Sequence, residues 1–248
     1  MKTPANSRAD ICYPSCVPPV RRAPYPGVVA TVLTVNVGQL RSNPAGGPTR
    51  TGIDKHPTDS VIAVRAPGGT SEGAGSGLEG DAIGDTGVHG GDDQAVYAYA
   101  REDLDWWQGT LGRELANGQF GENLTTREID VTGALIGEQW HIGDGGLVLE
   151  VSAPRIPCRT FAAWLDLRGW VKTFTAQAIP GAYFRVISPG VVREGDGIAV
   201  KNRPEHDVTV GLAFRALTLE SELLPRLLDA PALPEHVKET VRRRSGSA

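Results

Sequence analysis

The chain has 248 residues, of which 40% are hydrophobic and 22% charged, and its formal net charge at pH 7 is -4. This balance is typical of a water-soluble globular protein with one sizeable core and excludes a disordered chain. The slight acidic excess excludes a global positive field for nucleic acid, and the lack of a long apolar run or a secretory signal pattern argues against a membrane or exported protein. We therefore expect a cytoplasmic protein that binds neither nucleic acid nor a membrane.

Glycine and proline are frequent, with 31 and 18 copies, which favours short strands and tight turns over long helices. Residues 1–27 are rich in proline and poor in apolar periodicity, so we expect them to be disordered or draped over the surface. They contain Cys12 and Cys16, to which the sequence assigns no role. The chain has three cysteines, and an odd number predicts at least one free thiol.

The first predicted strand is the β-branched run from Val28 to Gly38, which is ended by glycine and is typical of a buried strand. Two short strands separated by a turn are expected over residues 51–57 and 60–64. The glycine-rich tract over residues 68–80 is expected to form a surface loop.

A helix is predicted to begin near Glu102, because acidic residues precede an aromatic pair there, as in the first turn of a helix. From Ile129 onward short strands alternate with glycine turns, a spacing that suits an antiparallel barrel. The strands are expected over residues 139–143, 146–152 and 183–187, and further helices over residues 161–170, 218–228 and 234–241.

These elements predict a mainly β chain. A β-barrel with a few peripheral helices is expected over residues 28–212, and a short helical appendage over residues 213–248. No flavin, haem or iron–sulfur motif accompanies them.

One cysteine, Cys158, is the centre of the predicted chemistry. Pro154 and Pro157 fix the backbone around it at the end of a predicted strand, so its thiol is presented rigidly. Arg155 and Arg159 flank it, and nearby guanidinium charge favours the thiolate, the form that attacks electrophiles and ligates soft metals. The alternative is a buried, inert cysteine that acts as a small hydrophobic residue.

Three further polar segments are candidates for binding a ligand. His89 precedes Gly90 and Gly91, whose missing side chains allow a ligand to approach the backbone, although a tight turn would look the same. The segment from Gly121 to Thr125 is broken by glycine and supplies hydrogen-bonding groups for a polar ring. Lys55 is suited to contact a phosphate as a point charge, although a solvated lysine is the commoner outcome.

The combination and order of seven short segments is more specific than any one of them. The segments are Thr51–Lys55, Gly80–Asp81, His89–Gly91, Phe120–Thr126, Ile136–Glu138, Val151–Cys158 and Gly181–Val186. Together they strongly resemble the YiiM-type MOSC family, whose domain is shared with the C-terminal part of molybdenum cofactor sulfurases. The resemblance covers residues 28–204, and the terminal helices are similar to the three-helix appendage of YiiM-type members.

The resemblance implies a MOSC-type (PK-like) mixed β-barrel that binds the molybdenum cofactor (molybdopterin), a pterin dithiolene with a phosphate tail. Cys158 would be the catalytic cysteine and the protein ligand to molybdenum. Lys55 would face the cofactor phosphate, and His89, Asn123 and Arg155 would line the pterin pocket. The other residues expected to bind the cofactor are Gly90, Gly91, Gly121, Glu122, Leu124 and Thr125.

Three functions remain open at this point. The favoured one, implied by the resemblance, is a molybdoenzyme that reduces small N-hydroxylated compounds, such as hydroxylamino-purines, with electrons from a separate reductase. The second is a carrier of sulfur or of the cofactor that uses a persulfide on Cys158. The third is a non-catalytic cofactor-binding module in which Cys158 is structural.

Deletion of residues 1–27 is predicted to leave the fold intact, because a proline-rich segment with few apolar anchors contributes little buried area. Thermal unfolding of the shortened and full chains measures this. A melting temperature that drops by more than roughly 5 °C, equivalent to about 1 kcal/mol or more, would show that the segment packs on the domain.

Overall fold

The structure is a computed structural model, and it describes residues 29–68, 75–87 and 89–246. Residues 1–28 lie outside this part of the chain, so the expectations for the N-terminal segment, with Cys12 and Cys16, stay predictions. Within the described ranges, no helix is long and apolar enough to cross a membrane.

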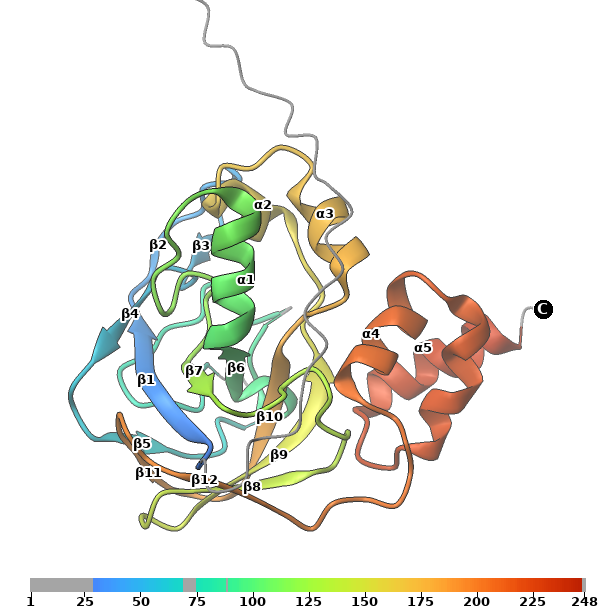
Figure 1. Cartoon of the computed structure of the whole chain (residues 1–248). Coiled ribbons are helices and arrows are strands. Elements are labelled where there is room, and N and C mark those ends of the chain that lie inside the picture. The colour runs from blue at the N-terminus through green and yellow to red at the C-terminus, as the bar shows by residue number, and fades with distance from the viewer. Residues whose placement is uncertain (1–28, 69–74, 88, 247–248) are drawn as a thin grey trace, which may run out of the picture.

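The centre of the fold is a mixed sheet of eight strands in the order β12-β8-β9-β10-β6-β7-β1-β4 (Figure 1). The pair β6–β7 is parallel and the other neighbours are antiparallel. The strands are β1 (Thr31–Gly38), β4 (Lys55–Thr58), β6 (Val96–Ala100), β7 (Leu124–Arg127), β8 (Gln139–Ile142), β9 (Leu147–Pro154), β10 (Ala182–Ser188) and β12 (Ile198–Lys201).

The sheet curls so that β1 meets the segment that leads into β12. The backbone N–H of Ile198 donates to the carbonyl of Ala30 at 2.7 Å, and that of Val32 donates to Asp196 at 2.9 Å. The ladder between β1 and β12 is limited to a single bridge at Thr31, so strand pairing does not close a complete barrel. The prediction of a mainly β, mixed-sheet fold is confirmed.

Two small sheets lie beside the main one. β5 (Ile62–Val64) pairs with β11 (Gly190–Val192), and β2 (Arg41–Ser42) pairs with β3 (Arg50–Thr51). β5 also holds the end of the glycine-rich tract, because the N–H of Glu79 donates to Ala63 at 2.9 Å and Leu78 is buried. The prediction of a surface loop is therefore wrong for residues 77–79, and residues 69–74 lie outside the described part.

Helix α1 (Arg101–Leu111) follows β6 directly, with Glu102 and Asp103 in its first turn as predicted. The expected helix over residues 161–170 is wrong in extent: α2 (Arg159–Trp164) and α3 (Trp170–Gln177) are separate helices. The chain breaks between them because Asp166 and Gly169 adopt left-handed backbone conformations, with φ of 49° and 72°.

The three helices α1, α2 and α3 gather at one end of the sheet (Figure 1). They enclose a second core made largely of aromatic rings that pack edge to face or tilted, a geometry that adds to the gain from burial. Its fully buried rings are Tyr99, Trp107, Phe120, Phe161, Trp170, Phe174 and Phe214.

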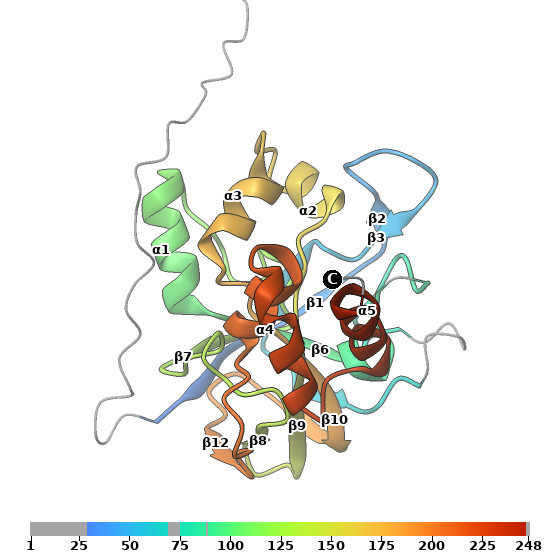
Figure 2. The same cartoon turned by 90° about the vertical axis from the view of Figure 1, so that its right-hand side faces the viewer.

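The C-terminal appendage has three helical segments, α4 (Val210–Thr218), η3 (Ser221–Asp229) and α5 (Glu235–Ser245). The sequence predicted only the second and third, and the expected boundary at residue 213 falls inside α4. In Figure 2 the appendage faces the viewer in front of β9. Its buried Leu227 belongs to the same hydrophobic cluster as Trp140 and Leu149 of the sheet, so the two parts share one core.

Replacing Leu227, which is fully buried, with alanine is predicted to destabilise the whole chain by about 2–5 kcal/mol. All five tryptophans lie outside the appendage, so their fluorescence during urea unfolding reports on the sheet and its covering helices. Leu227→Ala should lower the midpoint of that fluorescence transition, whereas Leu228→Ala at the adjacent, 42% exposed position should change it little. An unchanged transition for Leu227→Ala would show that the appendage unfolds independently.

Candidate functional site

A pocket of about 130 Å³ opens where the loops around β3, β4 and β6 meet the start of α2. Seven residues predicted from the sequence to form the site line it: Lys55, His89, Gly90, Gly121, Asn123, Arg155 and Cys158. The other lining residues were not predicted from the sequence to form the site; they are Asn43, Arg50, Thr51, Gly52, Ile53, Ala82, Ile83, Gly84, Asp85, Gln94, Tyr97, Thr160 and Tyr183.

Four predicted residues do not line the pocket. Gly91 lies at the start of the short helix η2 (Asp92–Gln94), and Leu124 and Thr125 are buried in β7. Glu122 is fully buried and accepts hydrogen bonds from the backbone N–H groups of Gly118 at 2.6 Å and Phe120 at 3.0 Å. None of the four lines the pocket, so their contact with a ligand stays a prediction.

Glu122 instead holds the turn that carries the pocket residue Gly121. The hydroxyl of Thr125 also donates to its carboxylate, at 2.9 Å. Burial raises the pKa of Glu122, and the hydrogen bonds from Gly118 and Thr125 oppose that rise.

Cys158 stands immediately before α2 with an extended backbone, and its side chain is partly buried. Burial alone would raise the pKa of its thiol. The hydrogen bond with His89, the charge of Arg155 and the backbone N–H of Phe161 outweigh burial and lower the pKa to about 7. Arg159, which the sequence placed beside Arg155 in this role, is exposed, and His89 takes its place.

Arg155 is a buried cation in the wall of the pocket. Its guanidinium carbon lies 4.0 Å from the ring centroid of Phe161 and 5.1 Å from that of Tyr97, both within cation–π range. The same group donates to the carbonyl of Phe120. These contacts fix a positive charge near Cys158, and no carboxylate among the described residues forms an ion pair with it. The charge is therefore available to a thiolate or an anionic ligand.

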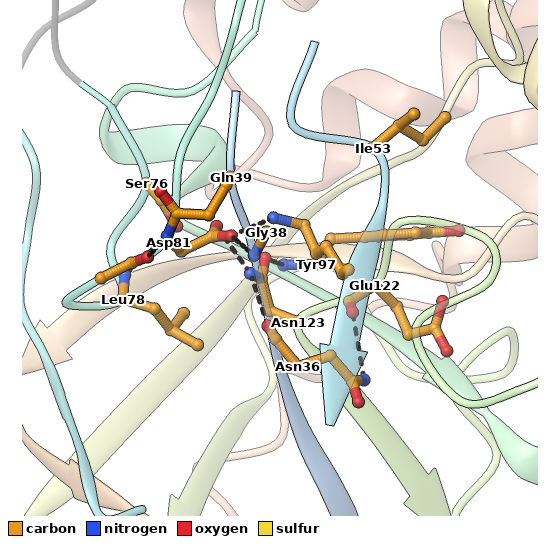
Figure 3. Close-up of polar contacts among 12 residues, drawn as sticks. Asn36, Gly38, Gln39, Ile53, Ser76, Leu78, Asp81, Tyr97, Glu122 and Asn123 are labelled. Atoms are coloured by element: carbon orange, nitrogen blue, oxygen red, sulfur yellow. Dashed lines mark hydrogen bonds and ion pairs between the residues drawn. The ribbon is translucent and has the colours of Figure 1, made fainter. Parts of the chain in front are cut away.

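Lys55 forms a buried ion pair with Asp81, whose side chain is fully shielded from solvent. Burial lowers the pKa of Lys55, and the charge and hydrogen bond of Asp81 oppose that fall. Asp81 also accepts from the backbone N–H of Gly38 at 2.8 Å and from Nδ2 of Asn123 at 2.9 Å (Figure 3). The charge of Lys55 is therefore balanced within the protein before any ligand binds.

Asn123 lines the pocket, but its side-chain amide is already used by the protein. Its Oδ1 accepts from the backbone N–H of Tyr97 at 3.1 Å, and its Nδ2 donates to Asp81 and, at 3.4 Å, to the carbonyl of Asn36 (Figure 3). Both N–H donors of the amide are therefore used within the protein, whereas its oxygen keeps a second lone pair that could accept from a polar ring.

Part of the pocket wall is bare backbone. A Cβ atom added to Gly52 would lie 1.8 Å from the carbonyl oxygen of Ala82, and one added to Gly84 would lie 2.0 Å from that of Arg50. Both distances are far below contact, so glycine is required at these positions for the two loops to touch.

The lining residues absent from the prediction differ in whether the sequence offered a signal. Gly52 and Tyr183 lie inside segments that carry the family resemblance, so position within a motif pointed to them. Residues 82–85 come from a loop without periodicity, and only the folded arrangement brings them to the pocket. Gln94 ends the short helix η2, which follows the predicted His89–Gly91 segment.

The chain is similar to several known proteins. A family model described as "MOSC domain" matches residues 85–199. The uncharacterized protein YflK of Bacillus subtilis is 31% identical over 209 residues, which cover 83% of this chain and 90% of YflK.

Two further relatives were found. A protein of Gibberella moniliformis named "Reductase" is 28% identical over 214 residues, which cover 85% of this chain but 36% of that protein. The crystal structure of YiiM from Geobacillus stearothermophilus superposes with a TM-score of 0.69 at 24% identity, covering 87% of this chain and 98% of that one. The structural likeness supports the fold.

Alkylation of Cys158 is predicted to follow a titration with a midpoint near pH 7 in the cofactor-free protein. A Cys12→Ser, Cys16→Ser background leaves Cys158 as the sole thiol, and the rate of reaction with iodoacetamide is measured against pH. His89→Ala should raise the midpoint because it removes the hydrogen bond to the thiolate, whereas Arg159→Ala should leave it unchanged. A midpoint at or above the free-cysteine value of about 8.5 would contradict this account of the site.

Proposed function

Because the chain belongs to the MOSC domain family, we propose that its pocket binds the molybdenum cofactor and that the protein is an oxidoreductase acting on N-hydroxylated compounds. The observation that carries the proposal is the Cys158 thiol, which lines the pocket beside Arg155 and His89 with a pKa lowered to about 7. With this pKa a large share of the thiol is ionised at neutral pH, and a thiolate is a soft ligand that suits a metal already bound by sulfur, such as molybdenum in its cofactor.

The donor set of the pocket fits a metal that arrives with ligands of its own. Within the described residues, no group of three or more His, Cys, Asp or Glu side chains is placed to hold a metal ion. A bare ion would therefore lack ligands here, whereas a pterin dithiolene brings two sulfur donors and needs little more than one thiolate from the protein. Cys158 would supply that ligand.

The phosphate of the cofactor would be met by Lys55. Asp81 occupies one of the three ammonium hydrogens of Lys55 and holds the side chain in place, which leaves further donors on the same group. Because the Asp81 carboxylate already balances one positive charge, this contact would be weaker than one from an unpaired lysine. Arg155 adds a buried positive charge to the same pocket.

The proposed reaction is the reduction of an N–O bond, in which R–NH–OH takes two electrons and two protons and gives R–NH₂ and water. The molybdenum centre, when bound, supplies the two-electron chemistry. The protein would orient the substrate and exclude bulk water. Burial raises the pKa of Tyr97 and Tyr183, so both phenols stay protonated. The hydroxyl of Tyr97 already donates to the carbonyl of Pro180 at 2.8 Å, so Tyr183 is the phenol that would donate a hydrogen bond to the ligand.

The electrons would come from a separate reductase. The sequence has no flavin, haem or iron–sulfur motif to supply them. The fungal relative named "Reductase" supports a reductive activity, although this chain corresponds to 36% of that longer protein. A reduced thiol at the site suits the cytoplasm, which is the location we propose.

A second candidate function rests on the same thiol. An accessible thiol with a lowered pKa also suits a carrier that holds a persulfide on Cys158 and delivers sulfur or cofactor elsewhere. The two candidates differ in whether molybdenum stays bound through purification.

Metal and pterin analysis of protein made in a host competent for cofactor synthesis tests the proposal. The parent is expected to carry stoichiometric molybdenum and pterin, and to reduce a hydroxylamino-purine when reduced viologen supplies the electrons. Cys158→Ser should lose the metal or show one sulfur fewer around it in X-ray absorption spectra, because oxygen is a poorer ligand for a soft site. The Cys12→Ser, Cys16→Ser variant serves as the matched control and should resemble the parent.

Purified parent protein that contains neither molybdenum nor pterin would contradict the proposal. Molybdenum coordination that is unchanged in Cys158→Ser would contradict the role of that residue alone.

A further inference from the structure

Most polar side chains of the pocket have partners within the protein. Both nitrogen donors and the oxygen of the Asn123 amide have partners, and Lys55 is paired with Asp81. Gln94 differs, because its Oε1 atom is buried and has no hydrogen-bond partner in the described part of the chain. Among the buried side-chain atoms there without a partner, this is the one that belongs to a residue lining the pocket.

Hydrogen bonds on both sides of Gln94 hold its backbone in place at the pocket. Its N–H donates to the carbonyl of Gly91 at 3.0 Å, and the preceding Asp93 is bound by Nε of Arg185 at 3.0 Å. The carbonyl of the following Ala95 accepts from Gly77 at 2.7 Å. The acceptor without a partner therefore belongs to a segment whose backbone is anchored.

A buried acceptor without a partner is costly, and native structures rarely keep one unless a ligand or water satisfies it. The geometry points to a ligand that brings a hydrogen-bond donor into the pocket. We propose that Gln94 recognises the N–H edge of an amino-substituted pyrimidine ring. A glutamine amide suits such an edge, because its oxygen accepts from an amino or ring N–H while its nitrogen donates to a neighbouring ring acceptor.

This inference rests on the proposed function, which offers two sources of the edge. The pterin of the cofactor carries an aminopyrimidine ring, and a hydroxylamino-purine substrate carries a pyrimidine ring whose N-hydroxyamino group places an N–H on its edge. Both present the same chemistry to Gln94, so the experiment must separate them.

The test compares Gln94→Met with the parent and with Gln177→Met, a matched control at the end of α3 and outside the pocket. Methionine keeps the length of glutamine and removes both polar atoms. In cofactor-free protein, Gln94→Met is expected to melt at or above the parent temperature, because it removes an unsatisfied buried acceptor. In protein made with cofactor, it is expected to lose ligand affinity by roughly tenfold.

Two further readouts identify the source of the edge. A fall in pterin and molybdenum content after dialysis assigns the contact to the cofactor. Unchanged content with a roughly tenfold higher KM for a hydroxylamino-purine, and an unchanged kcat with reduced viologen, assigns it to the substrate.

Two outcomes would overturn the inference. Cofactor-free Gln94→Met that melts below both the parent and Gln177→Met would show that Gln94 has a structural partner. A variant that equals the parent in pterin content and in KM would show that water alone satisfies Oε1. A parent protein that binds no cofactor would instead overturn the proposed function, so the two failures are distinguishable.

Discussion

The pocket depends on the interactions of one buried group, the carboxylate of Asp81. It has no solvent exposure and binds three donors from different parts of the chain: the N–H of Gly38, the ammonium of Lys55 and the amide of Asn123. These lie at the end of β1, the start of β4 and the segment before β7. A buried carboxylate is stable only when it is paired, so Asp81 depends on its three donors. In turn, the carboxylate holds the three donors together. The N–H of Ala82 donates back to the carbonyl of Gly38, which brings the loop after Asp81 to the pocket.

Much of the fold follows from patterns that the sequence displays. The β-branched run of β1 and the acidic first turn of α1 have local causes, and both elements form as predicted. At the break between α2 and α3, Gly169 is a local signal, because glycine adopts its left-handed conformation readily. Asp166 takes the same kind of conformation, which its residue type alone does not predict. Helix α4 was not expected because its residues are apolar nearly all round, which gives a buried helix no polar face to reveal its period.

In the site, too, residue type could be read from the sequence, whereas spatial partners could not. Cys158, Arg155, His89 and Lys55 have side chains suited to bind a ligand, and the fold gathers them at one pocket. The side chain of Glu122 is equally polar, yet it points into its own turn, a direction that residue type cannot reveal. Spatial partners also decide the remaining roles: His89, distant in sequence, assists the thiol that adjacent Arg159 was expected to assist, and Asp81 neutralises Lys55.

The two glycines of the pocket wall set a limit on how this protein can evolve. Since a side chain at Gly52 or Gly84 would collide with the backbone of the facing loop, neither position can acquire new chemistry without separating the two loops. Substitutions that change the ligand are therefore expected at lining positions that carry a side chain, such as Asn43 and Thr160. Libraries intended to change selectivity would be directed to those positions and would keep the glycines fixed.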